Sequence, residues 1–161
     1  MLKAKTAALI AATFLVSATV VVAEVPFAYG HGGSEYSAGE PGNPKKPARV
    51  VIITMTDTDG KMGYFPDRVE VRKGEQIKFV LKNNGALEHE FMLATVQENA
   101  EHAELMKKFP EMEHDDPNAK SIKPKQSAEI LWQFTKAGEF QYGCLIPGHL
   151  EAGMRGTVIV K

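Results

Sequence analysis

The sequence predicts an all-β protein, a sandwich of seven or eight short strands with one short helix inserted. Most of the chain contains β-branched runs or alternates apolar and polar residues, a pattern that indicates strands. Clusters of Gly, Pro, Asp and Asn interrupt these runs at short intervals, as expected for turns. Many short strands joined by turns are typical of an antiparallel sandwich, and no internal repeat points to another architecture.

The chain up to residue 96 supplies four predicted strands. Residues 50–55 form a β-branched run that ends in a cluster of turn residues. Residues 68–72 alternate charged and apolar side chains, and residues 76–83 alternate with a period near two. The fourth predicted strand covers residues 89–96. These four segments therefore account for about half of the expected sandwich.

After residue 96 the spacing of apolar residues changes to that of a helix, and it later returns to that of strands. Residues 98–109 have alanine, leucine and methionine available for one helical face, and Pro110 cannot continue the helix. Residues 110–120 read as an acidic loop. Strands resume at residues 128–134, 139–143 and 156–160. The only tryptophan, Trp132, is expected in the core.

The N-terminus predicts export. Residues 1–30 have the basic start and the small, apolar stretch of a secretory signal, with cleavage after Ala23 or Gly30. The alternative is an uncleaved membrane anchor, although about 18 apolar residues is short for a span. Residues 31–47 are rich in Gly, Ser, Pro and Lys and read as a flexible arm, which leaves residues 48–161 as one domain. We expect a periplasmic protein with no membrane contact after cleavage.

The composition limits the kinds of partner that the chain is expected to bind. The chain has 19 Lys and Arg residues against 20 Asp and Glu residues, a formal net charge of −1. No basic patch indicates nucleic acid. The chain contains one cysteine, Cys144, so no internal disulfide can form and the thiol is either free or occupied.

Four residues make up a candidate metal site. His149 follows Cys144 after four intervening residues, Met154 follows after four more, and His89 lies upstream in a strand-like run. Two imidazoles, a thiolate and a weak axial thioether are the ligands of an electron-transfer copper site. The alternative is a buried and inert cysteine.

This C-x4-H-x4-M loop with a distant histidine resembles that of the cupredoxin, or type 1 blue copper, family. Its spacing is similar to that of rusticyanin and auracyanin, and the resemblance covers residues 48–161. The segments 88–91, 112–118 and 144–149 are most similar to small periplasmic cupredoxins associated with bacterial copper tolerance. The resemblance implies a cupredoxin-like Greek-key sandwich that brings His89 beside Cys144.

The resemblance also implies roles for the neighbouring residues. Pro147 and Gly148 would make the turn that presents His149, and Gly153 would allow close backbone approach before Met154. An apolar patch around His149 would dock redox partner proteins. We expect its members to be Leu145, Ile146, Pro147 and Leu150. Glu90 departs from the family, which often has Asn or Ser there, and is either a carboxylate beside copper or a solvent-facing residue.

Weaker signals point to further metal binding. Met112 and His114, among acidic residues, form a candidate second site whose alternative is a solvated loop. His31 would become the amino terminus after cleavage at Gly30 and could add a copper ligand, or it belongs to a tail. His102 has no evident partner in the sequence and is expected on the surface.

Two functions share the primary site. The first is a monomeric periplasmic carrier of single electrons that cycles Cu(II) and Cu(I). The alternative is copper handling, by binding or oxidation, for copper tolerance. No enzyme is expected, because the five histidines form no H-x-H pair and a binuclear centre needs two cysteines.

Overall fold

The computed structural model describes residues 36–58 and 61–161. Within them the chain folds into two five-stranded sheets and one helix, α1 (Val96–Lys108). The first sheet has the order β1-β8-β5-β2-β3 and the second β4-β10-β9-β6-β7. The strands are β1 (Glu40–Pro41), β2 (Arg49–Thr56), β3 (Gly63–Phe65), β4 (Arg68–Val71), β5 (Gln76–Asn83), β6 (His89–Ala94), β7 (Ala119–Ile122), β8 (Ser127–Gln133), β9 (Gly138–Gly143) and β10 (Arg155–Val160).

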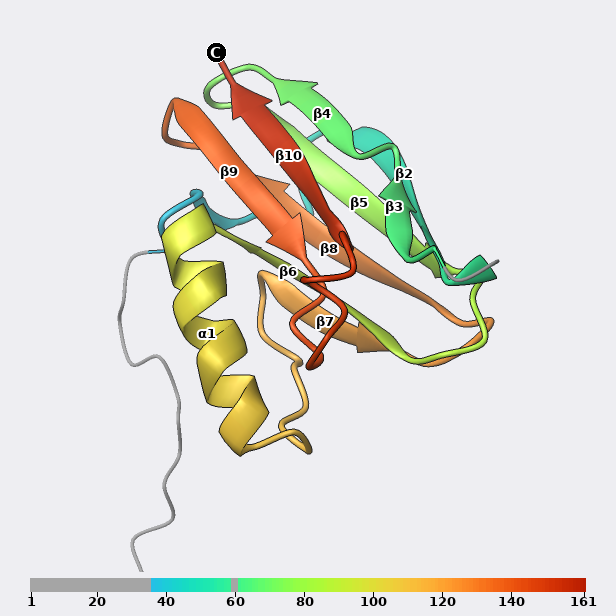
Figure 1. Ribbon diagram of the computed structural model, residues 1–161. Helices are drawn as coiled ribbons and strands as arrows, with labels where there is room; N and C mark the ends of the chain where they lie inside the picture. Colours follow the sequence, from blue (N-terminus) through green and yellow to red (C-terminus); the bar gives the residue numbers. More distant parts are fainter. Residues whose placement is uncertain (1–35, 59–60) are drawn as a thin grey trace, which may run out of the picture. The chain divides into compact units, whose positions relative to one another are not determined.

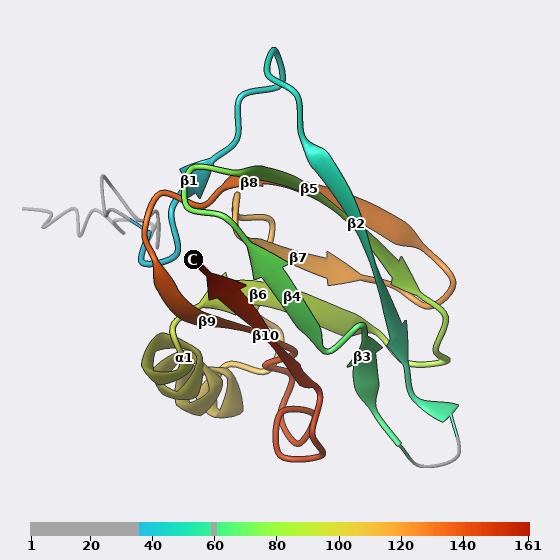
Figure 2. The same cartoon turned by 90° about the horizontal axis from the view of Figure 1, so that it is seen from above.

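The two sheets lie face to face as layers, and α1 lies outside the second sheet (Figures 1 and 2). The predicted all-β sandwich with one short helix is confirmed. The predicted antiparallel pairing is wrong in two places, since β2 pairs with β5 in parallel and β10 pairs with β4 in parallel. The described residues hold ten strands rather than seven or eight, because β1, β3 and β7 are too short to leave a pattern in the sequence. The Greek-key connectivity stays a prediction.

The core lies between the sheets and is strongly aromatic. Tyr142 stacks on Phe91 with ring centroids 5.2 Å apart, and Phe79 meets Phe91 at 5.4 Å. Trp132 is fully buried, as predicted. Buried side chains alternate along the strands in β5 and β8, which matches the apolar period in the sequence. This packed interior gives a rigid base for the loops at its ends.

The segment before the first long strand is ordered against the core. Ala38 is fully buried, Tyr36 meets the Trp132 ring edge-on at 5.2 Å, and β1 pairs with β8. The Trp132 indole also donates to the Ala38 carbonyl at 3.3 Å. This corrects the expected flexible arm over residues 36–47, because an indole in the core supplies a packing surface that composition does not show. Residues 31–35 lie outside the described part.

Helix α1 begins at a capping box. Thr95 accepts from the Glu98 amide, and the Glu98 carboxylate accepts from the Thr95 amide in return. The helix ends at Lys108, just before Pro110, and packs against β6 and β9. The helix predicted over residues 98–109 therefore begins two residues later than the observed helix. Thr95 caps the helix directly after β6 ends at Ala94.

The described residues contain no helix long and apolar enough to span a membrane. The predicted secretory signal, both candidate cleavage sites and His31 lie outside the described residues.

Candidate metal centre

Two neighbouring strands of the second sheet place the site. β6 begins with His89, and β9 ends just before Cys144. The two strands run antiparallel, with Met92 opposite Gly143, so the start of β6 and the end of β9 reach the same end of the sheet. The loop that follows Cys144 carries His149 and returns to β10 at Arg155. The topology therefore brings together residues that are 55 positions apart in the chain, counted from 89 to 144.

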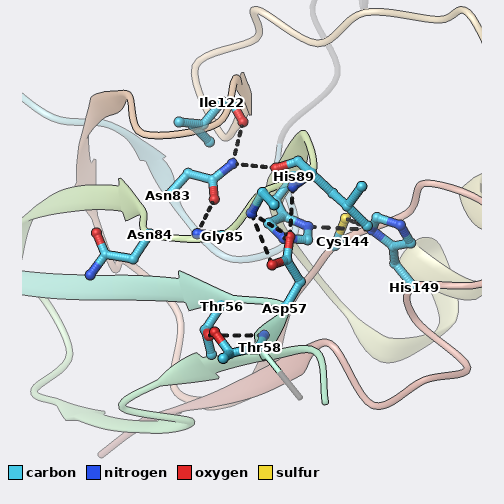
Figure 3. A network of polar contacts seen from close by, with 12 residues as sticks. Thr56, Asp57, Thr58, Asn83, Asn84, Gly85, His89, Ile122, Cys144 and His149 are labelled. Atoms are coloured by element: carbon cyan, nitrogen blue, oxygen red, sulfur yellow. Dashed lines mark hydrogen bonds and ion pairs between the residues drawn. The ribbon is translucent and has the colours of Figure 1, made fainter. Parts of the chain in front are cut away.

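The ligand atoms of His89, Cys144 and His149 lie within 4.8 Å of one another. The Nδ1 atoms of the two histidines are 3.4 Å apart, and the His149 Nδ1 is 3.2 Å from the Cys144 Sγ. Figure 3 shows both rings directed toward the sulfur. The structure thus gathers three of the four predicted ligand residues into one cluster.

The loop after Cys144 is tied at both ends by backbone hydrogen bonds. The Cys144 amide donates to the Met154 carbonyl at 3.1 Å, and the Met154 amide donates to the His149 carbonyl at 3.0 Å. Met154 is fully buried in the core cluster that also contains Cys144. This placement suits the fourth predicted ligand residue.

Two glycines allow the loop to turn. Gly148 has φ of 89° and Gly153 has φ of 97°, in the region that only glycine adopts without strain. The expected role of Gly148 in presenting His149 fits this geometry. The expected close backbone approach at Gly153 is wrong, since a Cβ there would meet nothing within 4 Å. Its positive φ is the reason for a glycine.

Asp57 holds the outer side of His89, a contact that the sequence did not reveal. Its Oδ2 lies 3.2 Å from the His89 Nε2, on the opposite side of the ring from Cys144 (Figure 3). The same carboxylate accepts the amides of Ala86 and Leu87 at 2.7 to 2.9 Å. These backbone donors lower the pKa of Asp57, so the group is a carboxylate. A carboxylate on the second nitrogen fixes the tautomer of a metal-binding histidine and raises its basicity.

The protonation states suit metal binding. Burial lowers the pKa of His89, against the opposing effect of Asp57, and burial also lowers the pKa of His149. Both imidazoles are therefore neutral near pH 7, with a lone pair to donate. Burial raises the pKa of the Cys144 thiol to about 12, so a metal must displace its proton. The Glu90 amide donates to the Cys144 Sγ at 3.3 Å and stabilises the thiolate form.

Glu90 is buried, which corrects the solvent-facing alternative. Only 3% of the residue is exposed, and burial raises the pKa of its carboxyl to about 7. Its backbone faces Cys144, while its side chain accepts from the Ser121 hydroxyl at 3.4 Å. Glu90 therefore contacts the Cys144 sulfur through its amide, and its carboxyl group lies close enough to add to the raised pKa of the Cys144 thiol.

The surface around His149 differs in part from the expected patch. His149 is half-buried, Pro147 is exposed, and Ile146 and Leu150 are half-buried. Leu145 is buried in a small cluster with residues of α1, so it is no part of the surface. The apolar surface beside His149 is thus smaller than the sequence suggested.

The acidic loop is packed more closely than a solvated loop. His114 is 5% exposed, and Met112 is half-buried against the apolar cluster of Ala103, Met106 and Leu145. His102, expected on the surface, is half-buried and lies with its Nε2 3.3 Å from the His114 Nε2. The structure brings His114 together with His102, while Met112 packs against the apolar cluster.

The primary cluster fits copper. Neutral imidazole nitrogens and a thiolate sulfur are donors that suit both copper oxidation states. The buried thioether of Met154 adds a soft sulfur nearby. A sandwich with such a donor set at one end is the structure of a cupredoxin-type copper protein.

The comparisons with known proteins agree with this class. Residues 51–161 match the model of copper-binding proteins of the plastocyanin/azurin family. A "copper-resistant cuproprotein CopI" from Rubrivivax gelatinosus is 47% identical over 123 residues, which cover 76% of this chain and 73% of the relative. A protein of the same name from Pseudomonas aeruginosa is 33% identical over 152 residues, 76% of this chain and 82% of the relative. The chain belongs to the plastocyanin/azurin family of copper-binding proteins.

Solved structures show the same fold. Auracyanin from Roseiflexus castenholzii superposes with a TM-score of 0.62 at 20% identity and covers 72% of this chain and 99% of its own. Auracyanin B gives a TM-score of 0.60 at 18% identity, with 80% and 99% covered. The predicted resemblance to cupredoxins, with auracyanin among them, is confirmed.

Proposed function

We propose that this chain is an exported copper-tolerance protein that binds one copper ion through His89, Cys144, His149 and Met154. The meeting of three ligand atoms within 4.8 Å, where β6 starts and β9 ends, carries the proposal. The names of the CopI relatives, at up to 47% identity, support a role in copper tolerance. The secretory signal expected from the sequence supports a periplasmic location.

The protein supplies fixed donors for one-electron chemistry. Copper bound there supplies a Cu(II)/Cu(I) couple that accepts or releases one electron. Asp57 orients His89, and the Glu90 amide holds the Cys144 sulfur. Because these contacts exist apart from any metal, both oxidation states meet nearly the same donor geometry, which favours rapid electron exchange. In copper tolerance the site would keep copper bound in either oxidation state, or oxidise bound Cu(I) to Cu(II) by passing the one electron to an oxidised redox partner protein.

Electron carriage is the second candidate function. His149 is half-buried beside the exposed Pro147, so one edge of a ligand ring lies close to the surface. Transient redox complexes use small interfaces of this kind. We place the docking of redox partner proteins at this surface, with the protein acting as a monomer.

Growth and absorption together test the proposal. The chain, expressed with its export segment in a copper-sensitive bacterium, should restore growth at raised copper, and Cys144→Ala should not. The purified Cys144→Ala protein should lose the intense thiolate-to-copper absorption and keep its β-type circular dichroism. Glu129→Gln, an exposed position on β8 that pairs with Lys78, is the matched control and should behave as wild type.

The outcomes separate the two functions. Equal growth with wild type and Cys144→Ala would show that tolerance does not use this site. A protein that has the absorption and exchanges electrons with soluble donors, but gives no tolerance, would favour the electron carrier. Retained absorption in Cys144→Ala would refute the ligand assignment itself.

A further inference from the structure

A second pair of histidines meets outside the primary cluster. His102 projects from α1, and His114 belongs to the loop between α1 and β7. Their Nε2 atoms are 3.3 Å apart and their ring centroids 4.9 Å apart. His114 is 5% exposed and His102 is half-buried, so the pair sits at the border of the interior. Neutral imidazoles at this distance share one hydrogen bond, which by itself needs no ligand.

A third group beside the pair changes that interpretation. The Glu90 Oε1 lies 3.9 Å from the His114 Nε2. The other carboxylate oxygen, Oε2, is buried and makes no well-formed hydrogen bond among the described residues, although the Leu145 amide lies near the carboxyl group. Glu90 itself is only 3% exposed. A buried carboxylate oxygen without a partner is costly, and a cation held between it and the two imidazole nitrogens would satisfy it.

We propose that His102, His114 and Glu90 form a second metal site, which binds a divalent transition-metal cation and prefers copper(II). Two nitrogens 3.3 Å apart subtend about 110° at a metal held by bonds of about 2.0 Å, so both can bind one ion. Two histidines and one glutamate are an established donor set for such ions. Copper(II) is preferred because it heads the affinity order of the divalent first-row metals.

Asp116 completes the arrangement from outside. Its Oδ2 lies 3.9 Å from the His114 Nδ1, on the far nitrogen of the ring. A carboxylate there favours a proton on Nδ1 and leaves the Nε2 lone pair for the metal. The proposed site keeps His114 from the sequence prediction but takes His102 and Glu90 in place of Met112, because Met112 packs against the apolar cluster.

The site lies next to the primary centre without sharing a ligand side chain. The Glu90 amide donates to the Cys144 sulfur, while its carboxylate faces His114. The proposal therefore goes beyond the proposed function, and it stands on contacts that involve neither His89 nor His149.

Copper counting on the whole chain tests it. The parent is a His31→Ala protein, so that the histidine outside the described residues does not compete. The protein is loaded with Cu²⁺ alone, excess is removed by gel filtration, and bound copper is measured with absorption and paramagnetic resonance. We expect two copper ions per chain, one with thiolate absorption and one without. His102→Ala and His114→Ala should each retain the absorption and bind one ion.

Three more variants sharpen the result. Glu90→Gln should weaken the second ion at least tenfold, since a charged ligand becomes neutral. Glu101→Ala removes an exposed carboxylate from the same helix and should still bind two ions. Cys144→Ala should lose the absorption and keep the second ion, so a failure of the primary site is recognisable separately. One ion in the parent, or two in the His102/His114 double variant, would overturn the proposal.

Discussion

Replacing Asp57 by Asn should raise the reduction potential of the copper centre by about 0.05–0.1 V. Asp57 is a charged acceptor on the His89 Nε2 at 3.2 Å, and its side chain is only 7% exposed. A negative charge behind a ligand stabilises Cu(II) more than Cu(I). Removing that charge therefore favours the reduced state.

The size of this shift in reduction potential follows from the distance between the Asp57 carboxylate and the copper. A path from the carboxylate through the imidazole to a metal on Nδ1 is about 7 Å, and one unit charge at that distance is worth about 2 kcal/mol at an effective dielectric of about 20. About 2.3 kcal/mol per electron corresponds to about 0.1 V. The amides of Ala86 and Leu87 already stabilise the Asp57 carboxylate and offset part of its charge. The expected shift in potential therefore extends down to about 0.05 V.

Asparagine suits the test because it preserves the shape. Its amide oxygen can take the place of Oδ2, which accepts from Leu87 and contacts His89. The Ala86 amide contacts both carboxylate oxygens, so it keeps an acceptor. The hydrogen-bond geometry is retained while the charge is lost.

Voltammetry at pH 7 on the copper-loaded protein is the assay, with the thiolate absorption as a check that the site is intact. Glu129→Gln removes one exposed charge from β8 and should leave the potential within experimental error. An unchanged or lower potential in Asp57→Asn, with normal absorption, would refute the idea that this carboxylate acts through His89.

Three further predictions concern single elements. Met154→Leu should keep copper and raise the potential by about 59 mV for each tenfold loss of Cu(II) affinity relative to Cu(I); voltammetry showing no rise would contradict an axial thioether. His149→Gly should recover its absorption with external imidazole more readily than His89→Gly, because His89 is fully buried; equal recovery would argue against His149 as the exposed ligand. Thr95→Ala should lower the free energy of unfolding by about 1 kcal/mol through loss of the helix cap, measured by urea denaturation, and an unchanged midpoint would show that the cap is dispensable.

The parts that local pattern controls were predictable from the sequence. The ligand loop is one such part, since Cys144, His149 and Met154 lie within one turn-rich segment whose spacing is chemical information in itself. The long strands β5 and β8 are another, because their inward positions alternate with solvent-facing ones. The short strands β1, β3 and β7 were missed, since so few positions show no clear period. β4, which is as short as β7, was predicted because its four residues alternate charged and apolar side chains.

Glu90 shows why alternation fails at the site. His89, Glu90 and Phe91 are buried in succession, although a half-exposed strand would turn Glu90 to solvent. β6 lies inside its sheet between β7 and β9, and α1 packs on it from outside. A strand covered on both faces has no solvent face, and only the tertiary structure reveals the cover.

Contacts across long separations could not be predicted either. Asp57 reads as an ordinary turn residue, and nothing within the sequence links it to a histidine 32 positions later. His102 and His114 lie on a helix and in a loop whose return path is set by β7 pairing with β6. Both pairs exist because separate elements converge, and single-sequence patterns contain no record of convergence.

The position of Glu90 determines how the two proposed sites would influence each other. A cation held by His102 and His114 places positive charge beside a residue whose amide already donates to the Cys144 sulfur. Positive charge near the thiolate favours the less positive primary copper, which is Cu(I). By linkage, reduction of the primary copper must then strengthen cation binding at the histidine pair by the same factor. The Glu90 carboxylate would stabilise the cation at the histidine pair through its own charge, so Glu90→Gln should weaken the second site and with it the effect of that site on the primary copper.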